Sequence, residues 1–235
     1  MRHEEKRKAK RPIGFRIFRF LIRRFLPAWR VVWRREEPDP DLACVFVCNH
    51  AKATGPVVMS AYFPRTLRPW ITEQMLSLKT MPSYMRNDLF PARTRLAYGI
   101  LTVAIAPIAL GALRSAKPIS SRSGKDAGIT IRESVESLIG GESNLIFPEN
   151  PQKIGSQEDG CGELQTGFLH IAPAYYEKTG RPLPFYPVAI CARDHTIRVG
   201  TRVSFDPDRA FMAQKAQIAK RLRTAISDLM RIELK

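Results

Sequence analysis

The chain has 235 residues and is strongly basic, with 38 Lys and Arg against 22 Asp and Glu and a formal net charge of +16. This length is enough for one domain with a normal hydrophobic core plus a short basic segment. The sequence contains no internal repeat or low-complexity tract, and the histidines at 3, 170 and 195 are too scattered to predict a metal site. The cysteines show no Cys-x-x-Cys spacing and are predicted to be reduced core residues of a cytoplasmic protein; they are Cys44, Cys48, Cys161 and Cys191.

The positive charge is concentrated at the amino terminus, where residues 1–35 hold 13 Lys and Arg and two Glu. Between residues 13 and 35, large apolar residues alternate with arginines at spacings of three and four, which predicts an amphipathic helix divided at Pro27. The predicted apolar face is Phe15, Phe18, Ile22, Phe25, Leu26, Trp29 and Val32, and the predicted basic face is Arg16, Arg19, Arg23, Arg30 and Arg34.

The arginines of this segment interrupt any hydrophobic run, so neither a signal peptide nor a membrane-spanning helix is predicted. A basic helix with aromatic anchors is typical of peripheral association with an anionic membrane surface, here at the cytoplasmic face. Two alternatives remain: a helix that packs on its own domain, and a nucleic-acid-binding arm, although no nucleic-acid-binding motif accompanies it. We therefore predict a membrane-associating segment over 1–37 and a domain over 38–235.

The rest of the chain alternates strands with helices, which predicts α/β layering. The apolar stretch 98–111, interrupted by Pro107, is interpreted as a core helix or as a lid that touches lipid. In chain order the elements are strand 42–48, a helix from 56, a mixed loop and helix region to 113, strand 119–122, helix 126–139, strand 143–148, helix 167–178, strands 184–191 and 196–204, and a final helix 208–232.

Four of the predicted strand regions carry short motifs that form one ordered set along the chain. The first ends in Asn49-His50, a later one in Phe147-Pro148-Glu149-Asn150, and between them a strand closes on Arg122; a fourth strand contains Pro187-Val188. In this order the four blocks resemble those of the phospholipid/glycerol acyltransferase family, over roughly residues 42 to 205. The departures are Gly55 for the family's Asp, Asn150 for its Gly, and Pro151-Gln152 for its Thr-Arg.

The resemblance implies a mixed, mostly parallel sheet flanked by helices and an acyltransferase of phospholipid biosynthesis. The acyl group would move from acyl-CoA or acyl carrier protein, without a further cofactor, to a lysophospholipid or glycerol phosphate-like acceptor. His50 is the implied general base, because an alcohol must lose its proton to attack a thioester. The implied substrate-binding residues are Asn49, Arg122, Phe147, Pro148, Glu149 and Asn150, with the Arg122 guanidinium on the phosphate.

Gly55 cannot make the hydrogen bond by which the family's Asp orients the catalytic histidine. A backbone carbonyl or Glu149 could orient His50 instead, the enzyme could be slow, or the protein could be a non-catalytic lipid- or partner-binding member of the fold. Gly55 would allow a positive φ or close approach of a ligand, and Pro56 suits the first turn of a helix, so the pair predicts a different helix entry. A nucleophilic Cys48 beside His50 is a minor alternative.

Overall fold

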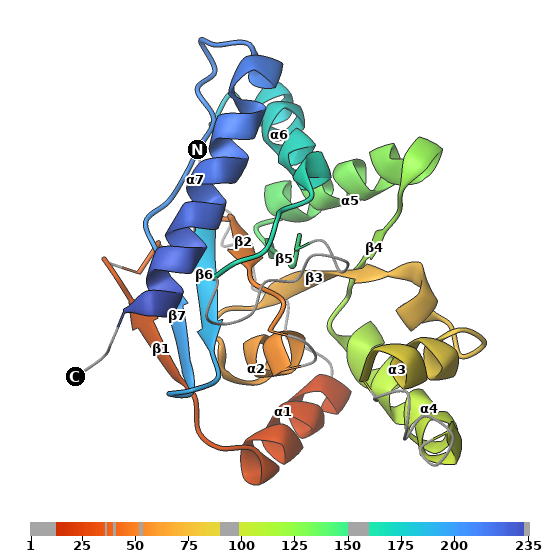
Figure 1. Ribbon diagram of the computed structural model, residues 1–235. Coiled ribbons are helices and arrows are strands. Elements are labelled where there is room, and N and C mark those ends of the chain that lie inside the picture. Colours follow the sequence, from red (N-terminus) through yellow and green to blue (C-terminus); the bar gives the residue numbers. More distant parts are fainter. Residues whose placement is uncertain are drawn as a thin grey trace, which may run out of the picture.

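The computed structural model describes residues 13–35, 37–39, 41–51, 54–89, 99–149 and 160–232. A seven-stranded sheet, in the order β1-β7-β6-β2-β5-β3-β4, forms the middle layer, and helices cover both of its faces (Figure 1). All neighbouring strands are parallel except β6 and β7. The predicted α/β class and the mixed, mostly parallel sheet are confirmed.

The four strands that are buried along their whole length are β2 (Val45–Cys48), β5 (Ser143–Ile146), β6 (Phe185–Cys191) and β7 (Thr196–Val199). β2 and β6 read as nearly continuous apolar runs because helices cover both sides of a mostly parallel sheet, whereas β5 and β7 also bury polar residues such as Asn144 and Arg198. The short strand β4 (Ile119–Ser121) forms one edge. These five strands were all predicted from the sequence, with ends that differ by a few residues.

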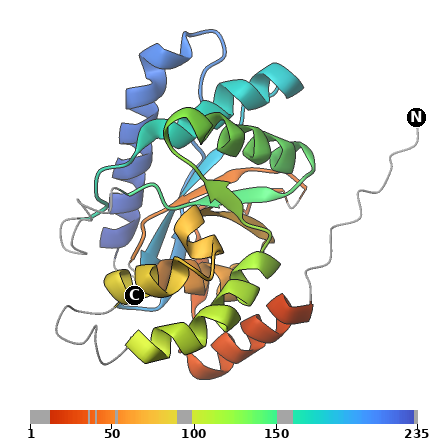
Figure 2. The same cartoon turned by 90° about the vertical axis from the view of Figure 1, so that its right-hand side faces the viewer.

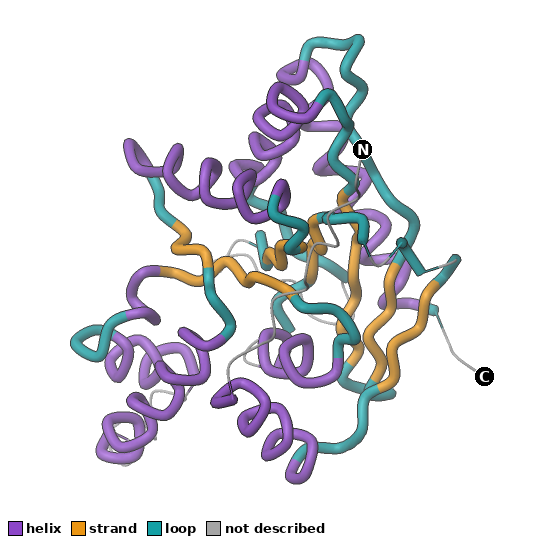
Figure 3. Tube along the Cα trace, turned by 180° about the vertical axis from the view of Figure 1, so that it is seen from behind, coloured by secondary structure: helices purple, strands orange, loops and turns teal. Residues whose placement is uncertain are grey.

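On one face of the sheet lie α5 (Ala127–Ile139), α6 (Ile171–Thr179) and α7 (Phe211–Arg231), and a 3-10 turn over Thr166–His170 leads into α6. The opposite face is covered by α2 (Thr54–Tyr62) and α1 (Ile13–Phe25). Seen from behind, the helices remain in these two layers (Figure 3). Each layer has its own apolar cluster, because alternate residues of β2 point to opposite faces: Val45 and Val47 to one, Phe46 and Cys48 to the other.

The amino-terminal segment differs from the prediction in its second half. Residues 13–25 are helical, but β1 (Arg30–Trp33) is a strand, so the second short helix predicted after Pro27 is wrong. This strand runs parallel to β7, and hydrogen bonds from the Arg30 amide to the His195 carbonyl (3.0 Å) and from the Arg34 amide to the Val199 carbonyl (2.9 Å) extend the pairing. The β-branched and aromatic residues of this stretch suit a strand once β7 offers an edge.

The predicted division of α1 into an aromatic face and a guanidinium face also differs from the structure. Phe15 is buried against the domain, and the Nε atoms of Arg19 and Arg23 donate to the Ala61 carbonyl at 3.0 and 2.9 Å. These three residues lie four positions apart in succession, so aromatic and basic side chains share the face toward α2. The carbonyl they bind lies in the last turn of α2, where positive charge is favourable.

The strand β3 (Leu67–Thr72) was not predicted, although it lies inside the sheet between β5 and β4. It contains Arg68 and Pro69, which weaken the pattern of a buried strand. A 3-10 turn over Glu73–Leu76 follows it, and then α3 (Met81–Leu89) and α4 (Gly99–Ser115), which pack against each other beside α1 (Figure 2).

The apolar stretch around Pro107 forms most of α4, where Ala106 and Leu110 are buried with Met81 in a small cluster and Val103 is exposed. No helix in the described part of the chain has the length and apolar character needed to cross a membrane.

Candidate active site

The carboxyl ends of four parallel strands meet at one edge of the sheet. At this edge β2 is followed by Asn49 and His50, β5 by Phe147 to Glu149, β3 by Glu73 and β4 by Arg122. Ligands of open α/β sheets bind outside the carboxyl ends of the strands, so this edge is the candidate site. Asn150, the remaining predicted site residue, lies outside the described residues.

Asn49 continues the pairing of β2 with β6 through its side chain. Its Oδ1 accepts from the Ile190 amide at 2.7 Å, and its Nδ2 donates to the Ile190 carbonyl at 3.3 Å. The side chain is buried, so both polar ends of the amide need these partners. Asn49 thereby holds the residue before His50 in a defined position.

Glu149 holds the backbone of His50 from the opposite side. Its Oε2 accepts from the His50 amide at 2.5 Å, and its Oε1 accepts from the Gly162 amide at 2.8 Å. Only 6% of Glu149 is exposed, and hydrogen bonds from main-chain amides are what make a buried carboxylate tolerable. The carboxylate therefore joins the ends of β2 and β5 to the segment that begins at Gly160, and it contacts the backbone of His50 instead of its ring.

The His50 ring is half-buried and lies edge-on to Phe147, with ring centroids 5.6 Å apart and planes inclined by 61°. Its Nδ1 atom is buried and has no hydrogen-bond partner among the described residues. Neither Glu149 nor a described backbone carbonyl bonds this ring nitrogen, so the two substitutes considered from the sequence are not found among the described residues. Among the described residues, packing against Phe147 constrains the imidazole.

Gly55 has a steric explanation that the sequence did not provide. Its φ is not in the positive range, but a Cβ at this position would lie 2.3 Å from the His50 carbonyl oxygen and 3.2 Å from Ile190 Cδ1. The first turn of α2 therefore packs directly on the backbone of His50, and no side chain fits at residue 55. The glycine reflects close packing on the protein's own backbone, and the positive φ considered from the sequence is not found.

The thiols near the site are not activated nucleophiles. Burial raises the pKa of Cys48 well above its ordinary value, and the nearby Cys161 and Glu149 raise it further. The pKa of Cys161 is also raised, by burial and then by Glu149. Thiols with raised pKa values stay protonated at neutral pH and are inert, which argues against a Cys48 nucleophile. All four cysteines are free and buried, as predicted for core residues.

Arg122 extends from the end of β4 toward two carboxylates. Its Nε is 2.8 Å from Glu73 Oε1 and its Nη1 is 3.3 Å from Glu133 Oε1. Its backbone amide donates to Thr130 Oγ1 at 3.0 Å, which fixes the turn into α5. The hydrogen bond to Glu73 is the main reason that the pKa of Arg122 is raised; burial opposes this rise, and Glu133 adds to it.

Arg122 and His50 both lie at the carboxyl ends of the strands but are not adjacent. Two strands, β5 and β3, lie between β2 and β4. Three strand spacings correspond to about 14 Å between the two backbones, so a ligand that contacts both residues must lie across the ends of the intervening strands. Sequence reasoning missed Glu73, because β3 was not predicted and nothing else marks this acid.

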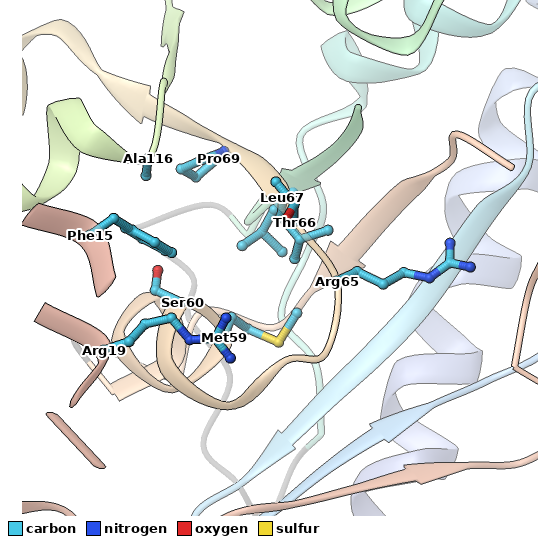
Figure 4. A pocket seen from close by; sticks show the side chains of 10 residues that line it. Phe15, Arg19, Met59, Ser60, Arg65, Thr66, Leu67, Pro69 and Ala116 are labelled. Carbon is cyan, nitrogen blue, oxygen red and sulfur yellow. The ribbon is translucent and has the colours of Figure 1, made fainter. Parts of the chain in front are cut away.

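A small cavity lies under α1, between α2 and the first half of β3 (Figure 4). Its volume is about 20 Å³, and apolar side chains such as Phe15, Met59 and Leu67 share its lining with Ser60 and Arg19. This volume holds roughly one water molecule, which is too little for an acyl chain. None of the residues at the carboxyl edge lines it.

The described residues include no group of three or more His, Cys, Asp or Glu side chains that could hold a metal ion. The groups that the structure places at this edge include an imidazole, a guanidinium and the carboxylates around them. An imidazole can accept a proton from a hydroxyl, and a guanidinium can hold a phosphate.

The fold has a counterpart among solved structures. The chain is similar to the 1-acyl-sn-glycerophosphate (LPA) acyltransferase PlsC from Thermotoga maritima, with a TM-score of 0.53 and 16% sequence identity. The similarity covers 94% of this chain and 78% of that chain. No family model and no curated protein matches the sequence. The architecture is thus that of an acyltransferase fold, at a sequence identity that speaks for the fold alone.

Proposed function

We propose that this protein is an acyltransferase that moves an acyl group from acyl-CoA or acyl carrier protein to the hydroxyl of a lysophospholipid or glycerol phosphate-like acceptor. The observation that carries the proposal is the placement of His50 at the carboxyl edge of the sheet. Its backbone is held by Glu149 and its ring by Phe147, in a fold shared with an LPA acyltransferase.

His50 acts as the general base. It takes the proton of the acceptor hydroxyl as that oxygen attacks the thioester carbonyl; the C–S bond then breaks, and the proton passes to the departing thiolate. Arg122 binds the acceptor headgroup, and Asn49, Phe147, Pro148, Glu149 and Asn150 shape the space around the reacting groups. No cofactor beyond the acyl donor is required for these steps.

The Nδ1 atom of His50, which has no hydrogen-bond partner among the described residues, bears on the rate. In a serine protease, replacing the carboxylate beside the catalytic histidine with an amide lowers turnover about 10⁴-fold. That value indicates how much turnover an imidazole can lose when no carboxylate accepts a hydrogen bond from its second ring nitrogen. The same observation favours the second candidate function, a non-catalytic member of this fold that binds lipid or a partner protein at a membrane.

An assay separates the two candidates. Purified full-length protein with labelled acyl donors and a panel of lysophospholipids should form diacyl product, and His50→Ala should abolish it. His170→Ala is the matched control, because His170 is exposed beside Lys215 and Phe211 and should leave turnover unchanged. Turnover that survives His50→Ala would refute the mechanism, and no turnover with any donor would favour the binding function.

We also infer that α1 attaches the protein to the cytoplasmic face of an anionic membrane. The side of α1 that faces away from α2 exposes Ile13, Ile17, Phe20, Leu21 and Phe25, with 68% of Phe20 and 79% of Phe25 accessible. Arg16 and Arg24 are also exposed on this helix. An apolar stripe beside guanidinium groups fits the boundary between lipid tails and anionic headgroups.

Point substitutions test this attachment without removing β1 from the sheet. Phe20→Glu and Phe25→Glu should each lower binding to anionic vesicles about tenfold or more, since each removes an aromatic side chain from the interface. Met212→Glu, an equally exposed apolar position at the start of α7, is the control and should have no effect. Equal losses for all three variants would show that added negative charge, and not this stripe, governs binding.

A further inference from the structure

Three charged side chains from separate elements meet at the end of β4. Arg122 lies between Glu73, which follows β3, and Glu133, which belongs to α5. Ser120 Oγ also lies 3.4 Å from Glu73 Oε1. The formal charges of these three side chains add up to one negative charge, although Arg122 is the residue proposed to bind the phosphate.

The cluster is accessible to a ligand. The Arg122 side chain is 26% exposed, and those of Glu73 and Glu133 are 61% and 36% exposed. The two carboxylates contact Nε and Nη1 of Arg122, and Nη2 has no hydrogen bond among the described residues. A guanidinium has five N–H donors, so it can bind one phosphate oxygen while it keeps both carboxylates.

The charge of the arriving headgroup then decides how well it binds. A phosphate monoester carries about −1.5 to −2 charges at neutral pH and would meet the two carboxylates as well as Arg122. A phosphodiester carries one negative charge, and an attached ammonium cancels it. Glu73, in the same cluster, can pair with such an ammonium. The carboxylates of Glu73 and Glu133 would instead repel the additional negative charge of a monoester.

We propose that Glu73 and Glu133 make this acceptor site select headgroups without net negative charge, such as an amine-bearing phosphodiester, over phosphate monoesters. Arg122 holds the phosphate and Glu73 the ammonium group. This specificity rests on the proposed acyltransferase function and on Arg122 as its acceptor-binding residue.

Soluble headgroups test the specificity apart from turnover. Binding of sn-glycerol 3-phosphate and of glycerophosphoethanolamine to the full chain is measured by NMR titration at low ionic strength, for wild type, Glu73→Gln and Arg122→Gln. The wild-type protein should bind glycerophosphoethanolamine more tightly than sn-glycerol 3-phosphate. Glu73→Gln should tighten glycerol 3-phosphate about fivefold and weaken glycerophosphoethanolamine by a similar factor, as expected for one partly exposed charge. Arg122→Gln should weaken both.

Glu142→Gln is the matched control, because Glu142 pairs with Arg68 at 3.9 Å just before β5, at the opposite end of the strands. It should leave both affinities unchanged. A preference that Glu73→Gln does not alter, or an absence of binding by either headgroup, would overturn the inference. If no lysophospholipid is turned over while the predicted preference is observed, the proposed catalysis fails and the specificity of the site stands.

Discussion

Gly55 offers the sharpest test of how the candidate site is built. Any side chain there places its Cβ 2.3 Å from the His50 carbonyl oxygen, whereas an ordinary carbon–oxygen contact is about 1 Å longer. The contact is with backbone atoms, so it cannot be relieved by rotating a flexible side chain. Either α2 or the backbone of His50 has to move.

We expect Gly55→Ala to destabilise the fold by about 2–3 kcal/mol, the upper part of the range of about 1–3 kcal/mol for overpacking a well-packed interior, because the clash is with backbone atoms. For a chain of this size that corresponds to a fall in Tm of roughly 4–12 °C. Gly128→Ala is the matched control: Gly128 is likewise the second residue of a helix, and a Cβ there meets nothing within 4 Å. This control should raise stability by about 0.5–1 kcal/mol, because alanine restricts the unfolded chain.

Gly55→Asp tests the same geometry by activity. An aspartate at this position, as in the acyltransferase family that the sequence resembles, would meet the same clash and would displace His50 instead of orienting it. Thermal unfolding followed by circular dichroism, together with the acyl-transfer assay, should show a less stable and no more active protein. A Gly55→Asp variant as stable as wild type and with higher kcat would refute this reasoning.

Three further predictions concern stability. Arg198→Met should lower the free energy of unfolding by about 2–4 kcal/mol in chemical denaturation, because the buried guanidinium donates to Asp194 and to the carbonyls of Leu229, in the last turn of α7, and Ile232, just after it; an unchanged denaturation midpoint would contradict this. Asn49→Leu should lower the free energy of unfolding by about 2–3 kcal/mol, because it leaves the buried amide and carbonyl of Ile190 without their hydrogen-bond partner. It should also lower turnover, and a variant with full stability would argue against the pairing. Burial raises the pKa of Cys44 from 9.0 to about 11, against weaker opposing effects of Ser143 and nearby arginine. The unfolded chain therefore loses this proton first, and up to about 2–3 kcal/mol of stability should disappear between pH 9 and 11. Cys44→Ala should remove that part of the alkaline loss in denaturation curves measured at several pH values, and an unchanged pH profile would contradict the assignment.

Much of the fold could be predicted because its elements carry local signals. The apolar runs of β2, β5 and β6 and the patterns of α5 and α7 are read from neighbouring residues alone. The same holds for His50 and Glu149, since a residue that follows a buried parallel strand is delivered to the carboxyl edge whatever the details of the fold.

The elements that were missed depend on distant partners. β1 was predicted as a helix, because arginines alternate with apolar residues there; it is a strand because β7 offers an edge for its hydrogen bonds. β3 contains a proline and an arginine and is a strand because β5 and β4 lie on its two sides. Strand propensity depends strongly on such context.

At the site, the sequence alone determined which residues arrive at the carboxyl edge of the sheet: an imidazole, an acid and a guanidinium, with a glycine where the family that the sequence resembles has an Asp. Only the tertiary structure decided what surrounds each of them. Glu149 binds the backbone of His50 instead of its ring, Glu73 reaches Arg122 across neighbouring strands, and the helix after His50 packs so closely that residue 55 has no room for a side chain. Some of these contacts join residues that are far apart in the chain, and others involve backbone atoms that no sequence pattern marks. Only the packed structure could therefore reveal them.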